Sequence, residues 1–489
     1  MAEGGWLYGL ATLIGASEPA LKLLISLLVG YPLLYIHRKF LHDKSPILQH
    51  FYFILGGVGI AIFNNGINVL HSMFCIFFAW LVLFLIGGTL LSVLVSFTFQ
   101  MGYLLIAYYI TGTDTYDIKW TMPHCVLTLR LIALAFDLYD GSSKTEDLSK
   151  DQQATALKIR PSLLEIAGHT YFPASFMVGP QFSMKRYLSF VHGTLYPVNT
   201  PSPVFAGLKR GFYGVLYLLI YQIGISIIPD SFLLSEPYMT MPFWKRFIMV
   251  GIWGKITLYK YVSCWLITEG ACILSGLAYS GKDQDGNPLW KGCANVKLFL
   301  FELSTQFGML IQGFNTNTNA WVAQYIYKRL KFLNNRYLSQ IGALLFLALW
   351  HGFHSGYYAC FFMEFIIMFM EKRLAMVLRK FPKLVSALES PPLSYILFVV
   401  MKFYTITFMG YCLGSFVLLK SSKWLEFYSS LYYIGHIFFG CWIVIEPLVK
   451  LILSVLFGKQ QDSPKSQNSV GNPSQSRKLD SGNENKKAV

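Results

Sequence analysis

The chain has 489 residues, of which 54% are hydrophobic and only 13% charged, with a net charge of +15. A soluble domain has about 25% charged residues, so this chain has too little polar surface to face water on all sides. Its basic residues are scattered through short loops between apolar runs, such as 37–44, 327–336 and 371–383. That distribution is typical of the cytoplasmic loops of a membrane protein and excludes a nucleic-acid partner as its explanation.

Apolar runs long enough to cross a bilayer, about 20 residues each, recur through most of the chain. In chain order they are 20–36, 48–63, 69–86, 89–110, 208–228, 247–278, 297–313, 340–370, 392–418 and 429–457. Residues 122–138 are a further candidate, with Arg130 and Asp137 on one helical face, and a structural ion pair or an interfacial helix is the simpler interpretation of this feature. We therefore predict an all-α, polytopic transmembrane bundle of about eleven spans with re-entrant segments.

The run 340–370 leaves its own topology open. As one straight helix its 31 residues would measure about 46 Å. A single crossing would place the basic loops 327–336 and 371–383 on opposite faces of the membrane. A bent or re-entrant run would place them on one face, as the distribution of positive charge favours.

Residues 139–160 form a polar segment that we place outside the bilayer, and residues 161–183 that follow are too short and too interrupted by Pro and Gly for one clean span. Irregular backbone is tolerated at membrane depth only where protein buries it or where it lines a hydrated cavity. The segment therefore indicates an internal cavity, which a simple anchoring span would not need.

The chain changes character after Phe457. Residues 459–489 are rich in Ser, Asn and Gln and have no apolar periodicity, so we predict a disordered tail behind a membrane-embedded domain of residues 1–458. Lys486 and Lys487 stand four and three residues from the end of the sequence, which is the pattern of a dilysine signal. Coat machinery would read this signal in the cytosol and retain the protein in the endoplasmic reticulum. The alternative is a chance pair in a basic tail.

Two histidines, His351 and His354, lie in the middle of an apolar run and on one helical face. A polar side chain in lipid is costly, so such residues usually face a cavity or a partner. Two histidines without a neighbouring carboxylate are too few for a metal site, and we predict none. A neutral imidazole that acts as a general base is the other interpretation.

Three asparagines, Asn315, Asn317 and Asn319, stand at the edge of another apolar run. Asparagine caps helices well, so a capping turn is one explanation of the cluster. An amide that donates a hydrogen bond to a developing oxyanion is the other. The spacing alone does not decide between them.

Several motifs together resemble the membrane-bound O-acyltransferase (MBOAT) family. They are "WHG" at 350–352, "SGYY" at 355–358, "FPASFMVGPQFSM" at 172–184, "FNTNTNAWV" at 314–322 and "YIYKRL" at 325–330. The resemblance implies an internal chamber in which His351 is the catalytic histidine and Asn315 the catalytic asparagine. It also implies an enzyme of the endoplasmic reticulum that moves a polyunsaturated acyl chain from acyl-CoA to the sn-2 hydroxyl of lysophosphatidylcholine or a related lysophospholipid.

In that reaction acyl-CoA is a substrate, and no cofactor is expected. The candidates for substrate contact are Lys328, Arg329 and Lys331, whose alternative is ordinary anchoring of a cytoplasmic loop, together with Asn317 and His354. A transporter or channel with broken helices around a polar cavity is the competing class of protein. Against it, the two halves of the chain show no internal repeat. The oligomeric state is left open.

Overall fold

The computed structural model describes residues 5–113 and 118–458, and its named elements in these ranges are all helices, as predicted. The helices of the first half are α1 Trp6–Leu13, α2 Glu18–Ile36, α3 Pro46–Asn65, α4 Val69–Ile86, α5 Leu90–Thr111, α6 Thr121–Ser142, α7 Lys150–Thr155, α8 Leu163–Thr170, α9 Met184–Val191, α10 Val204–Ile227, α11 Glu236–Met239 and α12 Phe243–Ser275. Those of the second half are α13 Leu298–Leu303, α14 Phe307–Gly313, α15 Thr316–Val322, α16 Arg336–His351, α17 Ser355–Leu378, α18 Pro382–Glu389, α19 Leu393–Leu418, α20 Ser421–Ser430, α21 Ile434–Gly440 and α22 Trp442–Phe457. Short helical turns complete the list: η1 His37–Leu41, η2 Gly66–Asn68, η3 Thr145–Asp147, η4 Asp230–Leu234, η5 Ala323–Tyr327 and η6 Arg329–Leu333.

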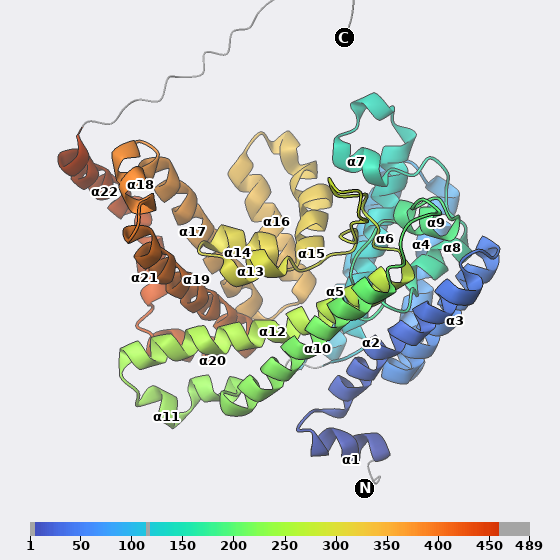
Figure 1. Cartoon of the computed structure of the whole chain (residues 1–489), viewed down its shortest axis with the longest axis horizontal. Coiled ribbons are helices and arrows are strands. Elements are labelled where there is room, and N and C mark those ends of the chain that lie inside the picture. The colour runs from blue at the N-terminus through green and yellow to red at the C-terminus, as the bar shows by residue number, and fades with distance from the viewer. Residues whose placement is uncertain (1–4, 114–117, 459–489) are drawn as a thin grey trace, which may run out of the picture.

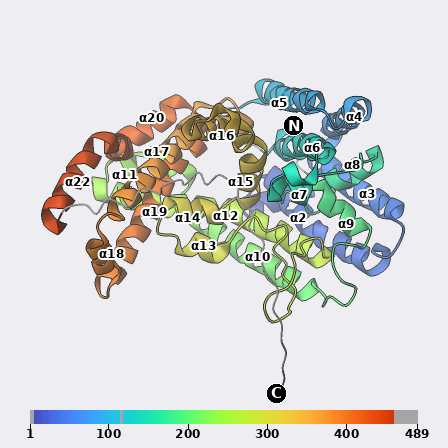
Figure 2. The ribbon, with the colours of Figure 1, turned by 90° about the horizontal axis from the view of Figure 1, so that it is seen from above.

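The helices form two packed groups (Figures 1 and 2). One core is built mainly by α2 to α6, α8 and α9 with α15 and α16, and the other by α13, α14, α17 and α19 to α22. The long helix α12 contributes side chains to both cores, so it joins the two groups. The predicted tail, with Lys486 and Lys487, lies outside the described residues.

Helix α10 packs closely along α12 because its contact face is made of glycine. A Cβ atom at Gly207 or Gly214 would collide with the main chain of α12, at Gly270 and at Ser263 and Ile267 respectively. Small residues along one face of a helix let two helix backbones approach closely. Such close packing stabilises the association of helices inside a membrane, where water does not drive it. The close contact brings Arg210 of α10 beside Glu269 of α12, with 2.6 Å between Nη2 of the guanidinium and Oε2 of the carboxylate.

The expected count of about eleven spans is not confirmed. Among the described residues, six helical segments are long and apolar enough to cross a bilayer, or seven if the pair α21 and α22, bent by 59°, is one span. The run 297–313 is divided into α13 and α14, whose six and seven residues are each too short to cross. Hydropathy alone does not reveal such breaks, which lie inside continuous apolar runs.

The run 340–370 is also two helices. α16 ends at His351 and α17 begins at Ser355, with only Gly352, Phe353 and His354 between them. The two helices pack against each other, and their far ends lie on the same side of the molecule, at the top of Figure 1. The basic loops 327–336 and 371–383 therefore lie on one face of the molecule, as the positive-inside rule predicts for two basic loops.

The interrupted segment 161–183 is buried by protein, as expected. After α8 it runs through turns and irregular backbone whose carbonyl groups meet the side chain of Arg130. The guanidinium donates to the carbonyl oxygens of His169, Thr170 and Pro180 at 2.9, 3.0 and 3.4 Å. It also reaches Ser175 Oγ at 3.2 Å. Arg130 thus replaces the hydrogen bonds that a regular helix would have supplied.

The prediction that Arg130 and Asp137 form an ion pair is wrong. The Asp137 carboxylate accepts a hydrogen bond of 2.7 Å from the hydroxyl of Tyr325 instead, and both side chains are buried. Most of α6 is enclosed by protein, so residues on its different turns meet different neighbours. Seven-residue spacing placed the two residues on one face but could not name their partners.

Replacing Arg130 by Met should destabilise the fold strongly. The side chain keeps most of its length, but three buried carbonyl groups lose their donor, and each such loss costs about 1–3 kcal/mol. We expect the free energy of unfolding to fall by about 3 kcal/mol or more, seen as a lower melting temperature in detergent. The exposed Arg160, which bonds one carbonyl, of Phe84, is the matched control, and Arg160→Met should have a much smaller effect.

Candidate active site

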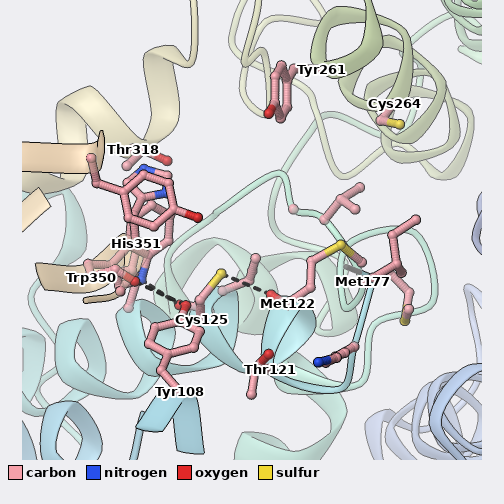
Figure 3. Close-up of a pocket in the computed structure, with 18 of the residues that line it drawn as sticks. Tyr108, Thr121, Met122, Cys125, Met177, Tyr261, Cys264, Thr318, Trp350 and His351 are labelled. Atoms are coloured by element: carbon pink, nitrogen blue, oxygen red, sulfur yellow. Dashed lines mark hydrogen bonds between the residues drawn. The ribbon is translucent and has the colours of Figure 1, made fainter. Parts of the chain in front are cut away.

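A cavity of about 440 Å³ lies among α5, α6, α12 and α15 to α17, and it brings the sequence-predicted residues together. Asn315 and His351 both line it, although 36 residues separate them in the chain. Figure 3 shows His351 beside Trp350 at one side of the cavity and Met122, Met177 and Tyr261 across it. Much of its wall is apolar, and its polar lining includes Lys119, Lys260, Gln181 and three asparagines, Asn295, Asn315 and Asn317.

His351 is the last residue of α16, so its ring stands at a helix end, and it lines the cavity. Aromatic rings surround it, with centroids at 4.6 Å for Trp350, 5.1 Å for Phe416, 5.5 Å for Tyr357 and 5.6 Å for Phe361. Neither nitrogen of the imidazole has a hydrogen-bond partner among residues 5–113 and 118–458. The rings fix the plane of the imidazole and leave its nitrogens available to a bound molecule.

Hydrogen bonds from two other helices hold the end of α16 in place. The Tyr108 hydroxyl donates to the Trp350 carbonyl oxygen at 3.1 Å, and Trp350 Nε1 donates to the Cys125 carbonyl oxygen at 2.9 Å. The chain then turns at Gly352, whose φ of +128° is strained for any residue with a Cβ atom. The position of His351 is therefore determined by α5, α6 and a glycine turn.

Asn315 occupies the N-cap position of α15 but does not act as a capping side chain. Its backbone is left-handed, with φ 49° and ψ 45°, a conformation that Asn tolerates better than most residues. Within the part of the chain that the structure describes, its side-chain amide makes no hydrogen bond to the helix or to another residue. The capping explanation therefore does not account for this amide, which is left to face the cavity that it lines.

The neighbouring candidates have more ordinary surroundings. Asn319 Nδ2 donates to the carbonyl oxygens of Ile311 and Phe314 at 3.0 and 2.9 Å, so this amide holds a turn. Asn317 lines the cavity, and its backbone N–H donates to Asn295 Oδ1 at 2.8 Å. His354 also lines the cavity, from the N-cap position of α17, and makes no capping hydrogen bond.

The three basic candidates lie away from the cavity. Arg329 holds the buried carboxylate of Asp140 through two hydrogen bonds, of 2.9 and 2.5 Å, and Lys328 pairs with Asp151. Lys331 is exposed in η6. None of the three is among the residues that line the described cavities. Lys328 and Arg329 each pair with a carboxylate, so neither presents an unpaired charge to a phosphate group, and their contact with substrate stays a prediction.

A second cavity of about 430 Å³ adjoins the first, and Gln181 and Asn317 line both. Its wall is more polar and includes Lys185, Arg186 and His169. A molecule with one apolar and one polar part could therefore extend from the first cavity into the second.

Sequence reasoning missed the residues that support the Asn315 turn. Asn295 lines the main cavity and is 3% exposed, and its backbone N–H donates to Glu269 Oε1 at 2.6 Å. Glu269 in turn pairs with Arg210. The carboxylate of Glu269 lies inside an apolar run, and such a group at membrane depth indicates a buried partner. The sequence alone does not identify that partner.

The arrangement combines three features that suit transfer of a group between apolar molecules. An imidazole with free nitrogens can take and return a proton, and an amide N–H₂ can stabilise an oxyanion. The largely apolar lining can hold an acyl chain. These groups supply the parts of an acyl-transfer site.

Comparison with known proteins supports that interpretation. Residues 105–415 match the model of the membrane-bound O-acyltransferase family. The chain is 48% identical over 442 residues to lysophospholipid acyltransferase 5 of Mus musculus, covering 90% of this chain and 91% of the relative. It is 43% identical over 451 residues to the protein of the same name in Drosophila melanogaster, with 90% of each chain covered. A lysophospholipid acyltransferase of Schizosaccharomyces pombe is 28% identical over 454 residues, 88% of this chain and 86% of that one.

Proposed function

Because this chain belongs to the membrane-bound O-acyltransferase family, we propose that it is an acyl-CoA-dependent enzyme that acylates the sn-2 hydroxyl of a lysophospholipid. The observation that carries the proposal is the shared cavity, in which the nitrogens of His351 and the amide of Asn315 both lack protein partners among the described residues. The names of the similar proteins supply the substrate class. Lysophosphatidylcholine and a polyunsaturated acyl chain remain the substrates that we expect.

In the mechanism that we propose, His351 takes the proton of the lysophospholipid hydroxyl as its oxygen attacks the thioester carbonyl carbon. The carbonyl oxygen becomes an oxyanion, to which the Asn315 amide donates a hydrogen bond. The intermediate collapses by breaking the C–S bond, and the proton on His351 passes to the departing CoA thiolate. No cofactor takes part, because a thioester is already activated toward attack.

The two adjoining cavities match the two chemical parts of acyl-CoA. Its acyl chain is apolar and its CoA part is polar and phosphorylated, while the main cavity is largely apolar with Lys119 and Lys260 in its lining and the second carries Lys185 and Arg186. A transporter would also have a polar cavity within a helical bundle. Purified protein given labelled acyl-CoA and lysophosphatidylcholine decides between the two: an acyltransferase forms phosphatidylcholine and free CoA, and a transporter forms neither.

The multi-pass membrane protein resides, we propose, in the endoplasmic reticulum with its C-terminus in the cytosol. The basic loops on one face support this orientation, since positive charge favours the cytosolic side. Replacing Lys486 and Lys487 with Ser should release part of the protein from the endoplasmic reticulum, because coat machinery would no longer read the pair. Microscopy measures the location, and specific activity should persist. Unchanged residence would contradict the signal.

A further inference from the structure

Helix α15 is capped by a side chain that does not belong to its own N-cap residue. In an ordinary N-cap, the side-chain oxygen of the capping residue accepts the backbone N–H two or three residues later. Here the N–H of Asn317, two residues after Asn315, donates instead to Oδ1 of Asn295 at 2.8 Å. The preceding N–H, of Thr316, donates to the backbone oxygen of Asn295 at 2.9 Å.

The short segment 293–297 serves as a template for the turn around Asn315. Besides the two bonds to Asn295, the Thr316 hydroxyl donates to the Ala294 carbonyl oxygen at 2.8 Å. On the other side of Asn315, the Lys297 N–H donates to the Gly313 carbonyl oxygen at 2.9 Å. Hydrogen bonds to one segment therefore flank Asn315 on both sides and hold its left-handed backbone.

The template is itself fixed to two long helices. Glu269 Oε1 of α12 accepts the backbone N–H groups of Asn295 and Val296, at 2.6 and 2.9 Å. Arg210 of α10 holds Glu269 and donates to the Val296 carbonyl oxygen at 2.6 Å. Because Glu269 and Asn295 are 2% and 3% exposed, little water competes for these bonds.

We propose that Asn295 is a positioning residue: it caps α15 in place of Asn315 and so keeps the Asn315 amide directed into the cavity for the reacting acyl group. The inference rests on the proposed function, because it assumes that Asn315 serves the reaction. Without Asn295, the N–H of Asn317 would lack an acceptor. The side chain of Asn315 stands at the N-cap position, from which an amide oxygen can accept this N–H, and an amide that caps its own helix no longer faces the substrate.

The test compares Asn295→Ala, Asn315→Ala and the double variant by kcat and KM for acyl-CoA in detergent. Asn295→Ala should lower kcat about 10- to 100-fold and leave KM within about threefold, because the donor is misplaced while the cavity remains. Asn295→Asp keeps an oxygen acceptor and should recover most of kcat. The double variant should be no slower than Asn315→Ala, because Asn295 acts through Asn315.

Thr316→Val is the matched control. It removes a hydrogen bond between the same two segments, but Thr316 does not line the cavity and the bond does not cap α15. If the capping of α15 determines the rate, the kcat of Thr316→Val should stay within about threefold of the kcat of the unmodified protein. If general support of the loop determines the rate, it should fall. Equal losses in Thr316→Val and Asn295→Ala would overturn the inference.

The outcomes separate this inference from the proposed function. Full activity in Asn315→Ala would refute the role of Asn315 itself. A slow Asn315→Ala beside a fully active Asn295→Ala, or losses that multiply in the double variant, would refute the positioning role alone. If Asn295→Ala does not fold, Asn295→Ser takes its place in the same comparison, and full kcat in every folded Asn295 variant overturns the proposal.

Discussion

Replacing His351 with Phe should lower kcat about 1,000-fold or more while the protein remains folded. The phenyl ring can keep the packing against Trp350, Tyr357, Phe361 and Phe416, whose rings surround the imidazole. It has no nitrogen to take the proton of the hydroxyl, and a general base contributes about 100- to 10,000-fold to such a reaction. Formation of labelled phosphatidylcholine and release of CoA measure the rate.

Two comparisons make this result specific. His351→Ala should be as inactive as His351→Phe, because chemistry and not ring packing is lost in both. His354→Ala, in the same cavity and three residues away, should lose less than about tenfold, since the mechanism gives its ring no proton to carry. If the His351→Phe protein retains more than about a tenth of the kcat of the unmodified protein, His351 is not the general base of the reaction.

The location of the site could be predicted because its residues are unusual for their surroundings. One is a histidine in the middle of an apolar run, and the other is an asparagine cluster at the edge of another run. Polar side chains at membrane depth usually face a cavity or a partner, because their burial in lipid costs free energy. The segment 161–183 also indicated a cavity by its broken backbone, and its carbonyl groups are indeed enclosed by protein, with Arg130 as their donor. These signals are local, so the sequence contains them.

The partners of buried polar groups could not be predicted, because they come from distant segments. Asp137 meets Tyr325, and Arg329 meets Asp140, across 188 and 189 residues of chain. Helical spacing paired Arg130 with Asp137 only because it considers one helix at a time. For the same reason the capping of α15 by Asn295 has no signature in the motif around Asn315.

The number of spans is not confirmed, for a different reason. Hydropathy measures whether a segment suits lipid, and it does not register a turn between two apolar helices. The break after His351 depends on Gly352, a single residue with φ of +128° within a run that is apolar on both sides. That break also places the imidazole at a helix end, where it lines the cavity.

Asn315→Ala should lower kcat about 100-fold or more, which is the usual effect of losing one oxyanion donor. KM for acyl-CoA should change little, because the amide acts on the charge that develops during reaction and not on the bound thioester. Asn315→Asp should be at least as slow. An ionised carboxylate has no hydrogen to donate and repels an oxyanion, although it is nearly the same size as the amide.

The neighbouring Asn319 provides the control that separates chemistry from support of the turn. Its amide bonds the carbonyl oxygens of Ile311 and Phe314, so Asn319→Ala should lower the melting temperature and reduce kcat much less than Asn315→Ala. The Asn315 amide has no such partner within the described chain, so Asn315→Ala should cost only the strain of an alanine in the left-handed backbone, about 1–2 kcal/mol. An Asn315→Asp protein with normal turnover would show that no donor is needed there, and the oxyanion would then have to be stabilised by another group of the cavity.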